Sequence, residues 1–123
     1  MTFDDPLTHE IIGAAMTVHN ALGTGFMEVV YQRSLAIEFH KRGIPFERER
    51  KIPIYYDGQK VGVRRVDFLV NQRVLVELKA VSVLNDLHLA QAINYLKVFQ
   101  LDVGLLMNFG GVRLEFRRLF RKK

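Results

Sequence analysis

The sequence predicts an α/β fold with two helices, three strands, one helix and two strands in that order. Two observations predict it. Apolar residues recur every three or four positions near the N-terminus and again between about residues 85 and 100, which is typical of amphipathic helices. Residues 46–79 change instead to alternation of period two and to runs of β-branched residues, which is typical of strands.

The first helix is expected over residues 8–22, with Thr8 or Asp5 as a suitable N-cap residue. Its apolar residues lie four, three and four positions apart: Ile11, Ala15, Val18 and Leu22. Gly23 interrupts this pattern, so a tight turn should follow. A second helix is expected over residues 26–42, because a glycine and then a proline come directly after it.

The next segment predicts three strands. Residues 46–56 alternate in charge and then in polarity, and Pro53 suggests an edge position because proline cannot donate to a strand ladder. Asp57-Gly58 is a hairpin turn signal that leads into a strand over residues 60–70. A third strand follows over residues 74–81.

A third helix should begin at Asn85 or Asp86, either of which can cap it, and extend to Gln100. Its apolar stripe consists of Leu89, Ala92, Ile93, Leu96 and Phe99. A separate polar face carries His88, Gln91 and Tyr95. Two strands, over residues 103–109 and 112–120, should close the fold around a pair of glycines.

Length and composition favour one globular domain spanning residues 1–123, since 49% of the residues are hydrophobic and 25% are charged. The absence of cysteine excludes disulfides and thiolate metal sites. No apolar run reaches the length of a membrane span, and the N-terminus lacks the apolar region of a signal peptide. A cytoplasmic protein without a membrane partner is therefore expected.

The formal net charge is +5, and six basic residues against one acid occupy the last eleven positions. These basic residues are Arg113, Arg117, Arg118, Arg121, Lys122 and Lys123. A basic balance of this kind suits a polyanion such as nucleic acid. A solvated basic tail is the alternative interpretation.

Two apolar runs, residues 66–70 and 74–79, flank a polar segment of three residues, Asn71 to Arg73. If all three residues form the loop, Asp67 lies directly opposite Glu77, where like charges are unfavourable. A two-residue loop would instead put the two carboxylates on opposite faces of the hairpin. An ordinary hairpin with one solvated, charged face is also compatible with these residues.

Lys79 lies two positions after Glu77 and should therefore point to the same face of the strand. Two carboxylates and an ammonium on an apolar sheet are costly unless a ligand uses them. A divalent cation such as Mg²⁺, which takes oxygen ligands, would relieve the repulsion between the acids.

Three motifs in this order resemble a known family. Asp67, a gap of nine residues, and then Glu77-Leu78-Lys79 resemble the PD-(D/E)xK nuclease signature, although Val66 stands where a proline is often found. Gln91 to Tyr95 matches the QxxxY motif of its RecB-like and lambda-exonuclease-like branches. Gly25 to Tyr31 matches the motif of the bacterial and archaeal GxxExxY family in the same superfamily. The resemblance extends from about Ile11 to Phe120.

This resemblance implies a restriction-endonuclease-like αβββαβ core, with a mixed sheet flanked by helices and an extra N-terminal helix. It implies that Asp67 and Glu77 bind Mg²⁺ or Mn²⁺ with the help of the Leu78 carbonyl, and that Glu28 completes the acidic site. It implies that Lys79 orients or deprotonates the attacking water and stabilises the charged transition state.

Gln91, Tyr95 and Tyr31 would then contact or position the substrate. Each residue also has a structural interpretation. Glu28 in a first helical turn complements the helix dipole, and tyrosines often pack at half-buried positions. Gln91 is compatible with an ordinary position on the surface of a helix.

The expected function is a metal-dependent nuclease that hydrolyses phosphodiester bonds, with DNA preferred to RNA as the substrate and a role in DNA repair or processing. Carboxylates that hold a divalent metal suit this reaction, because the metal activates water and polarises the phosphate. A catalytically inert module that binds nucleic acid or protein on the same fold is the alternative. A homodimer is compatible with the sequence, because one site cuts one strand.

Overall fold

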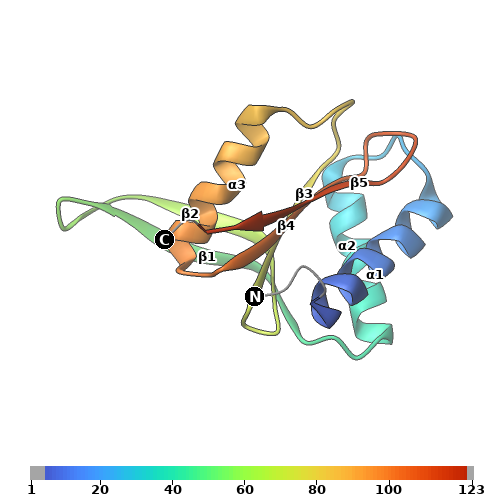
Figure 1. The fold of residues 1–123 in the computed structure, drawn as a ribbon, viewed down its shortest axis with the longest axis horizontal. Coiled ribbons are helices and arrows are strands. Elements are labelled where there is room, and N and C mark those ends of the chain that lie inside the picture. Colours follow the sequence, from blue (N-terminus) through green and yellow to red (C-terminus); the bar gives the residue numbers. More distant parts are fainter. Residues whose placement is uncertain (1–4, 122–123) are drawn as a thin grey trace.

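The structure is a computed structural model and describes residues 5–121 (Figure 1). Its helices and strands follow in the predicted order: α1 Pro6–Leu22, α2 Glu28–Lys41, β1 Phe46–Tyr56, β2 Gln59–Val70, β3 Val74–Lys79, α3 Asp86–Phe99, β4 Val103–Asn108 and β5 Glu115–Phe120. The predicted α/β class is confirmed. Among the described residues, no helix has both the length and the apolar character needed to span a membrane.

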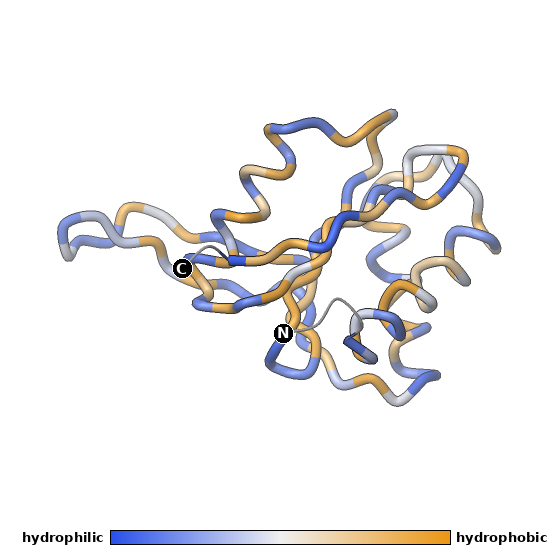
Figure 2. The backbone as a smooth tube through the Cα atoms, viewed as in Figure 1, coloured by the Kyte–Doolittle hydropathy of each residue, from blue (hydrophilic) through white to orange (hydrophobic). Residues whose placement is uncertain are grey.

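The five strands form one mixed sheet in the order β1-β2-β3-β4-β5. Only β3 and β4 are parallel, and α3 makes the crossover that a parallel pair requires. Helices α1 and α2 cover one face of the sheet and α3 covers the other, as Figure 1 shows. The central strands β3 and β4 are therefore buried almost throughout and are coloured hydrophobic along most of their length in Figure 2.

The loop between β2 and β3 has three residues, as one of the two predicted registers requires, because Val70 pairs with Val74. Asn71 and Gln72 have φ angles of 51° and 57°, and the Arg73 N–H donates to the Val70 carbonyl at 3.0 Å. Positive φ at both central residues is the geometry of a type I′ turn, which suits the twist of paired strands.

Several element ends differ from the sequence prediction. α2 begins at Glu28, two residues later than expected, because the turn before it is closed by side-chain contacts of its own. β3 ends at Lys79 and not near Val81, because the Val81 N–H is taken by a side chain from β4. β5 begins only at Glu115, since the glycine turn extends further than two residues.

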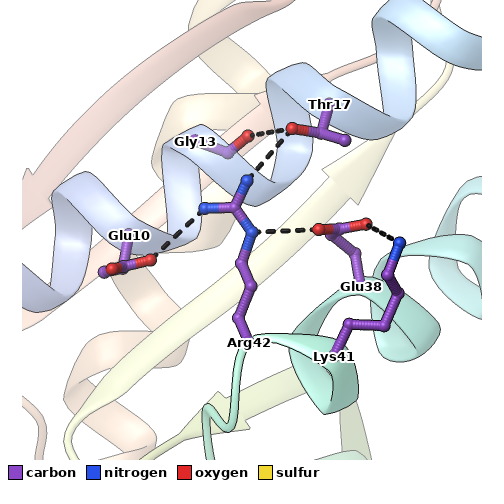
Figure 3. A network of polar contacts seen from close by, with 6 residues as sticks. All are labelled: Glu10, Gly13, Thr17, Glu38, Lys41 and Arg42. Atoms are coloured by element: carbon purple, nitrogen blue, oxygen red, sulfur yellow. Dashed lines mark hydrogen bonds and ion pairs between the residues drawn. The ribbon is translucent and has the colours of Figure 1, made fainter.

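Arg42, directly after α2, ties the two helices of one layer together (Figure 3). Its guanidinium donates to Glu38 of α2 at 3.0 Å, and to Glu10 and Thr17 of α1 at 3.3 and 3.0 Å. The absence of a side chain at Gly13 leaves room for this contact, since a Cβ there would lie 3.2 Å from Arg42 Nη1. The position of α2, which carries Glu28, is thus fixed from its C-terminal end.

Asp5, one of the two predicted caps, is the N-cap of α1. Its Oδ1 accepts from the Leu7 N–H at 2.9 Å, whereas Thr8 lies inside the first turn and donates to the Asp5 carbonyl. Arg73 of the β2–β3 loop donates to both oxygens of the same carboxylate, through Nη1 and Nη2. The hydrogen bond from Arg73 is the main cause that lowers the pKa of Asp5 from 3.8 to about 2.

Because the folded-state pKa of Asp5 is depressed, its contribution to stability is complete above pH 4 and is lost as the pH falls toward 2. We expect Asp5→Asn to keep the cap but lose the ion pair, at a cost of about 1 kcal/mol or less at neutral pH. Urea denaturation at several pH values measures this difference. Arg73→Gln removes the same ion pair from its other end and should lower the free energy of unfolding by the same amount. A loss of stability that is as large at pH 2 as at neutral pH would contradict the assignment.

Candidate active site

The residues predicted to form a site come from β2, β3, the first turns of α2 and the middle of α3. Glu77 and Lys79 of β3 lie on the face of the sheet that α3 covers. They line a small hollow together with His88, Gln91, Ala92, Tyr95 and Leu106. The hollow is therefore built from β3, β4 and α3, and the end of β3 lies at its base.

Asp67 and Glu77 lie where β2 and β3 separate. Backbone pairing between these strands ends at Phe68 and Val76. Beyond that pair, the Leu78 N–H donates to Asp67 Oδ2 at 2.8 Å, and the Asp67 N–H donates to Glu77 Oε1 at 3.0 Å. Two carboxylates thus accept hydrogen bonds from backbone N–H groups at the point where backbone pairing of β2 and β3 ends.

The two acids are neighbours, but they contact different helices. Asp67 Oδ1 accepts from Gln32 Nε2 of α2 at 2.7 Å, whereas the Glu77 side chain lines the hollow below α3. The prediction that both carboxylates project together from one face of the hairpin therefore needs correction. Only Glu77 and Lys79 share the hollow, and Asp67 approaches from the side of α2.

Burial raises the pKa of both acids. Glu77 is only 7% exposed, and burial, reinforced by the nearby Asp67 charge, raises its pKa to about 8. Burial also raises the pKa of Asp67, although hydrogen bonds from Leu78 and Gln32 oppose this effect. Ionising both of these adjacent carboxylates, one buried and one half-buried, is therefore unfavourable unless a proton or a further cation is bound.

Glu28 lies in the first turn of α2 and is exposed. Partial desolvation raises its pKa, and the charge of Lys79 acts in the opposite direction, followed by smaller contributions from Asp67 and His88. Glu28 is therefore within electrostatic range of the site.

The predicted completion of the metal site by Glu28 is not seen. Within residues 5–121, no group of three or more Asp, Glu, His or Cys side chains is placed to hold a metal ion. The donors that are close together, two carboxylates, nevertheless fit Mg²⁺ chemically, because Mg²⁺ is usually bound by one or two carboxylates plus water and substrate phosphate.

Tyr31 is not available to a substrate, which corrects the prediction of a substrate contact. Its side chain is fully buried and stacks on Phe109 with ring centroids 4.7 Å apart. Its hydroxyl donates to the Gly23 carbonyl at 2.7 Å and accepts from the Phe26 N–H at 3.3 Å. Tyr31 thus closes the turn that leads into α2 and so positions Glu28.

Gln91 and Tyr95 both line the hollow, one turn of α3 apart. Gln91 is half-buried, and Tyr95 is 9% exposed. The guanidinium of Arg64 lies over the Tyr95 ring, 4.4 Å from its centroid. Tyr95 therefore presents its ring face to a cation from β2. His88, next to Gln91 in the hollow, also takes part in the cap of α3, where it exchanges hydrogen bonds with Asn85.

Sequence reasoning assigned no site role to Gln32, Arg64 or Asn108. Asn108 is fully buried at the end of β4, and its side chain binds both the N–H and the carbonyl of Val81 at 2.9 Å. It thereby holds the segment that follows Lys79. A buried amide at the end of an apolar strand was the available signal for this role, since such a group must find partners.

The predicted basic C-terminal segment is partly neutralised. Arg117 binds Glu115 at 3.3 Å, and Arg121 binds Asp102 at 3.0 Å. Lys122 and Lys123 lie outside the described residues.

A structural role for Tyr31 predicts that Tyr31→Phe lowers the free energy of unfolding by about 1 kcal/mol, because two hydrogen bonds to the turn are lost while the ring remains. Urea denaturation measures this loss. Tyr55→Phe is the matched control, since Tyr55 is 62% exposed and should change stability by less than about 0.5 kcal/mol. If Tyr31→Phe is as stable as the wild type but binds the substrate more weakly, the predicted substrate contact of Tyr31 is supported instead.

Comparisons with known proteins give the family and the fold. A family model described as the PD-(D/E)XK nuclease superfamily matches residues 5–119. A solved structure titled "Crystal structure of SSO0001" has a TM-score of 0.59 at 17% identity, over 76% of this chain and 50% of that chain. This is a likeness of fold alone, and the chain spans about half the length of that protein. The comparison with curated proteins gives no match. Because the family model covers nearly the whole chain, the protein belongs to the PD-(D/E)XK nuclease superfamily.

Proposed function

We propose that the protein is a metal-dependent nuclease that hydrolyses phosphodiester bonds of nucleic acid, with DNA as the preferred substrate. The observation that supports this most directly is the adjacent acid pair beside Lys79 at the separating ends of β2 and β3. The ordered motifs around Glu28 and Gln91 support placement in the GxxExxY branch of the superfamily.

Asp67, Glu77 and the Leu78 carbonyl are the groups that would hold Mg²⁺ or Mn²⁺. When bound, the cation would lower the pKa of a water ligand and polarise the phosphoryl oxygens. Glu28 is placed to act on this site through its charge, since it is within electrostatic range of Asp67 and Lys79. Gln32 orients the Asp67 carboxylate by its 2.7 Å hydrogen bond.

Lys79 is the chain's own cation at the site. It is half-buried in the same hollow as Glu77. In this position an ammonium can bind a phosphate oxygen and stabilise the negative charge that increases in the transition state. Gln91 lines the same hollow and can orient either the substrate or Lys79 by hydrogen bonding.

A catalytically inert binding module on the same fold is the second candidate. Such a module would keep the fold and bind nucleic acid without turnover. Measurements of metal binding and of substrate cleavage distinguish the two candidates, because only the nuclease cleaves nucleic acid in a metal-dependent reaction.

Lys79→Ala should reduce Mg²⁺-dependent cleavage of DNA by at least about 100-fold, because charge stabilisation in the transition state is lost. Circular dichroism should show an unchanged fold. Lys97→Ala is the matched control, because Lys97 is an exposed lysine in the last turn of α3. Cleavage by Lys79→Ala at the wild-type rate would contradict the proposed chemistry.

Calorimetric titration with Mn²⁺ should show binding that Asp67→Asn removes, because the variant lacks one of the two adjacent carboxylates. Asp102→Asn is the control, because Asp102 is an exposed acid that pairs with Arg121 and is not one of the candidate site residues. This variant should bind Mn²⁺ as the wild type does. A wild-type protein that binds no Mn²⁺ would favour the inert module.

A further inference from the structure

Arg64 of β2 is a cation beside the hollow that the proposed chemistry does not use. Its strand position, opposite Ile52 of β1, lies two residues before Val66, which is buried under α3. Its guanidinium stacks over Tyr95, 4.4 Å from the ring centroid. Arg64 therefore extends from β2 toward α3 and reaches the hollow from its side.

Arg64 has unused hydrogen-bonding capacity. Its Nε is buried and has no hydrogen-bond partner within residues 5–121, and no ion pair in that part of the chain includes it. Because Nε is enclosed, the terminal Nη groups of the half-buried guanidinium are the donors that could reach a ligand, and they lie in the plane that stacks on the ring. That fork of donors matches the oxygens of a phosphate group.

The surroundings indicate where such a phosphate would lie. Arg64 is close enough to Glu77 for its charge to influence that acid. Tyr95, which holds Arg64, is four residues beyond Gln91, a distance of about 6 Å along α3. Arg64 is thus near Glu77, on the side of the hollow that Tyr95 lines.

We propose that Arg64 binds a phosphate group of the nucleic-acid substrate, next to the phosphate that is cleaved, and that Tyr95 is a positioning residue that holds the guanidinium by stacking. This inference rests on the proposed function, since it assigns a second phosphate to the same substrate. It gives Tyr95 a role through Arg64 and not through direct contact with the substrate, in agreement with its low exposure.

A structural role for Arg64, as a counter-charge for Glu77, predicts something different. In that case its loss would change the affinity for metal and leave metal-free binding of nucleic acid unaltered. A phosphate contact predicts the reverse, because each phosphate neutralised by a cation releases counterions and makes binding depend on salt.

The test measures binding of fluorescein-labelled duplex DNA by anisotropy in EDTA, over a series of salt concentrations. Arg64→Gln should weaken binding and reduce the slope of log K against log salt by about 0.9, the loss of one phosphate contact. Arg65→Gln is the matched control. Arg65 is the next residue, lies on the opposite face of the strand and has Glu49 at 3.7 Å, so its loss should leave the slope unchanged.

Arg64→Lys is a second variant that keeps the positive charge but lacks the planar guanidinium. It should keep the wild-type slope of log K against log salt and bind DNA more weakly than the wild type. In the cleavage assay Arg64→Gln should raise KM more than it lowers kcat. Duplexes with and without a 5′-phosphate show which phosphate Arg64 contacts. If Arg64→Gln binds both duplexes more weakly than the wild type does, the contact is to a backbone phosphate. If it binds only the 5′-phosphorylated duplex more weakly, the contact is to the terminal phosphate.

An unchanged slope for Arg64→Gln, an equal loss for Arg65→Gln, or a wild-type protein that does not bind DNA in EDTA would overturn the inference. Because this assay requires no turnover, its result is independent of the Lys79 experiment. If Arg64→Gln reduces the salt slope but the wild-type protein cleaves no nucleic acid, the phosphate site is supported and the proposed nuclease function is wrong.

Discussion

The site depends on two carboxylates that accept hydrogen bonds from backbone N–H groups at the point where β2 leaves β3. Asp67 accepts from the Leu78 N–H, and Glu77 accepts from the Asp67 N–H. These bonds satisfy backbone donors that would otherwise be buried without partners. They also keep two acids close together in a nonpolar part of the sheet, where charge is expensive. The same bonds therefore complete the sheet and create the site.

The two layers of helices support this arrangement from opposite sides. On one face, Gln32 of α2 binds Asp67, and the buried Tyr31 closes the turn that precedes Glu28. On the other face, α3 brings Gln91 and Tyr95 over Glu77 and Lys79. Since each helix contacts only part of the acidic pair, both layers must be in place before the site is complete.

The end of β3 is positioned by a further set of polar contacts. Asn108 at the end of β4 binds Val81, two residues after Lys79. Gly110 must be glycine for the chains to approach, because a Cβ there would lie 2.2 Å from the Val81 carbonyl oxygen. The parallel strands β3 and β4 are thus fastened together just beyond the residues proposed for catalysis, which keeps Lys79 in a defined direction.

The sequence by itself determined the order of the elements and the positions of the two hairpin turns, because these features follow from local periodicity and from turn residues. It left two registers open for β2 on β3, and only one of them places Asp67 beside Glu77; the structure selected that register.

Only the tertiary structure decided how the side chains are used. Tyr31 lies within a motif but is buried in the core, and Arg64 lies outside every motif but stacks on Tyr95, 31 residues away in the chain. Asp67 is held by Gln32, which is 35 residues before it. Such contacts depend on how α2 and α3 pack on the sheet, and neither periodicity nor spacing carries this information.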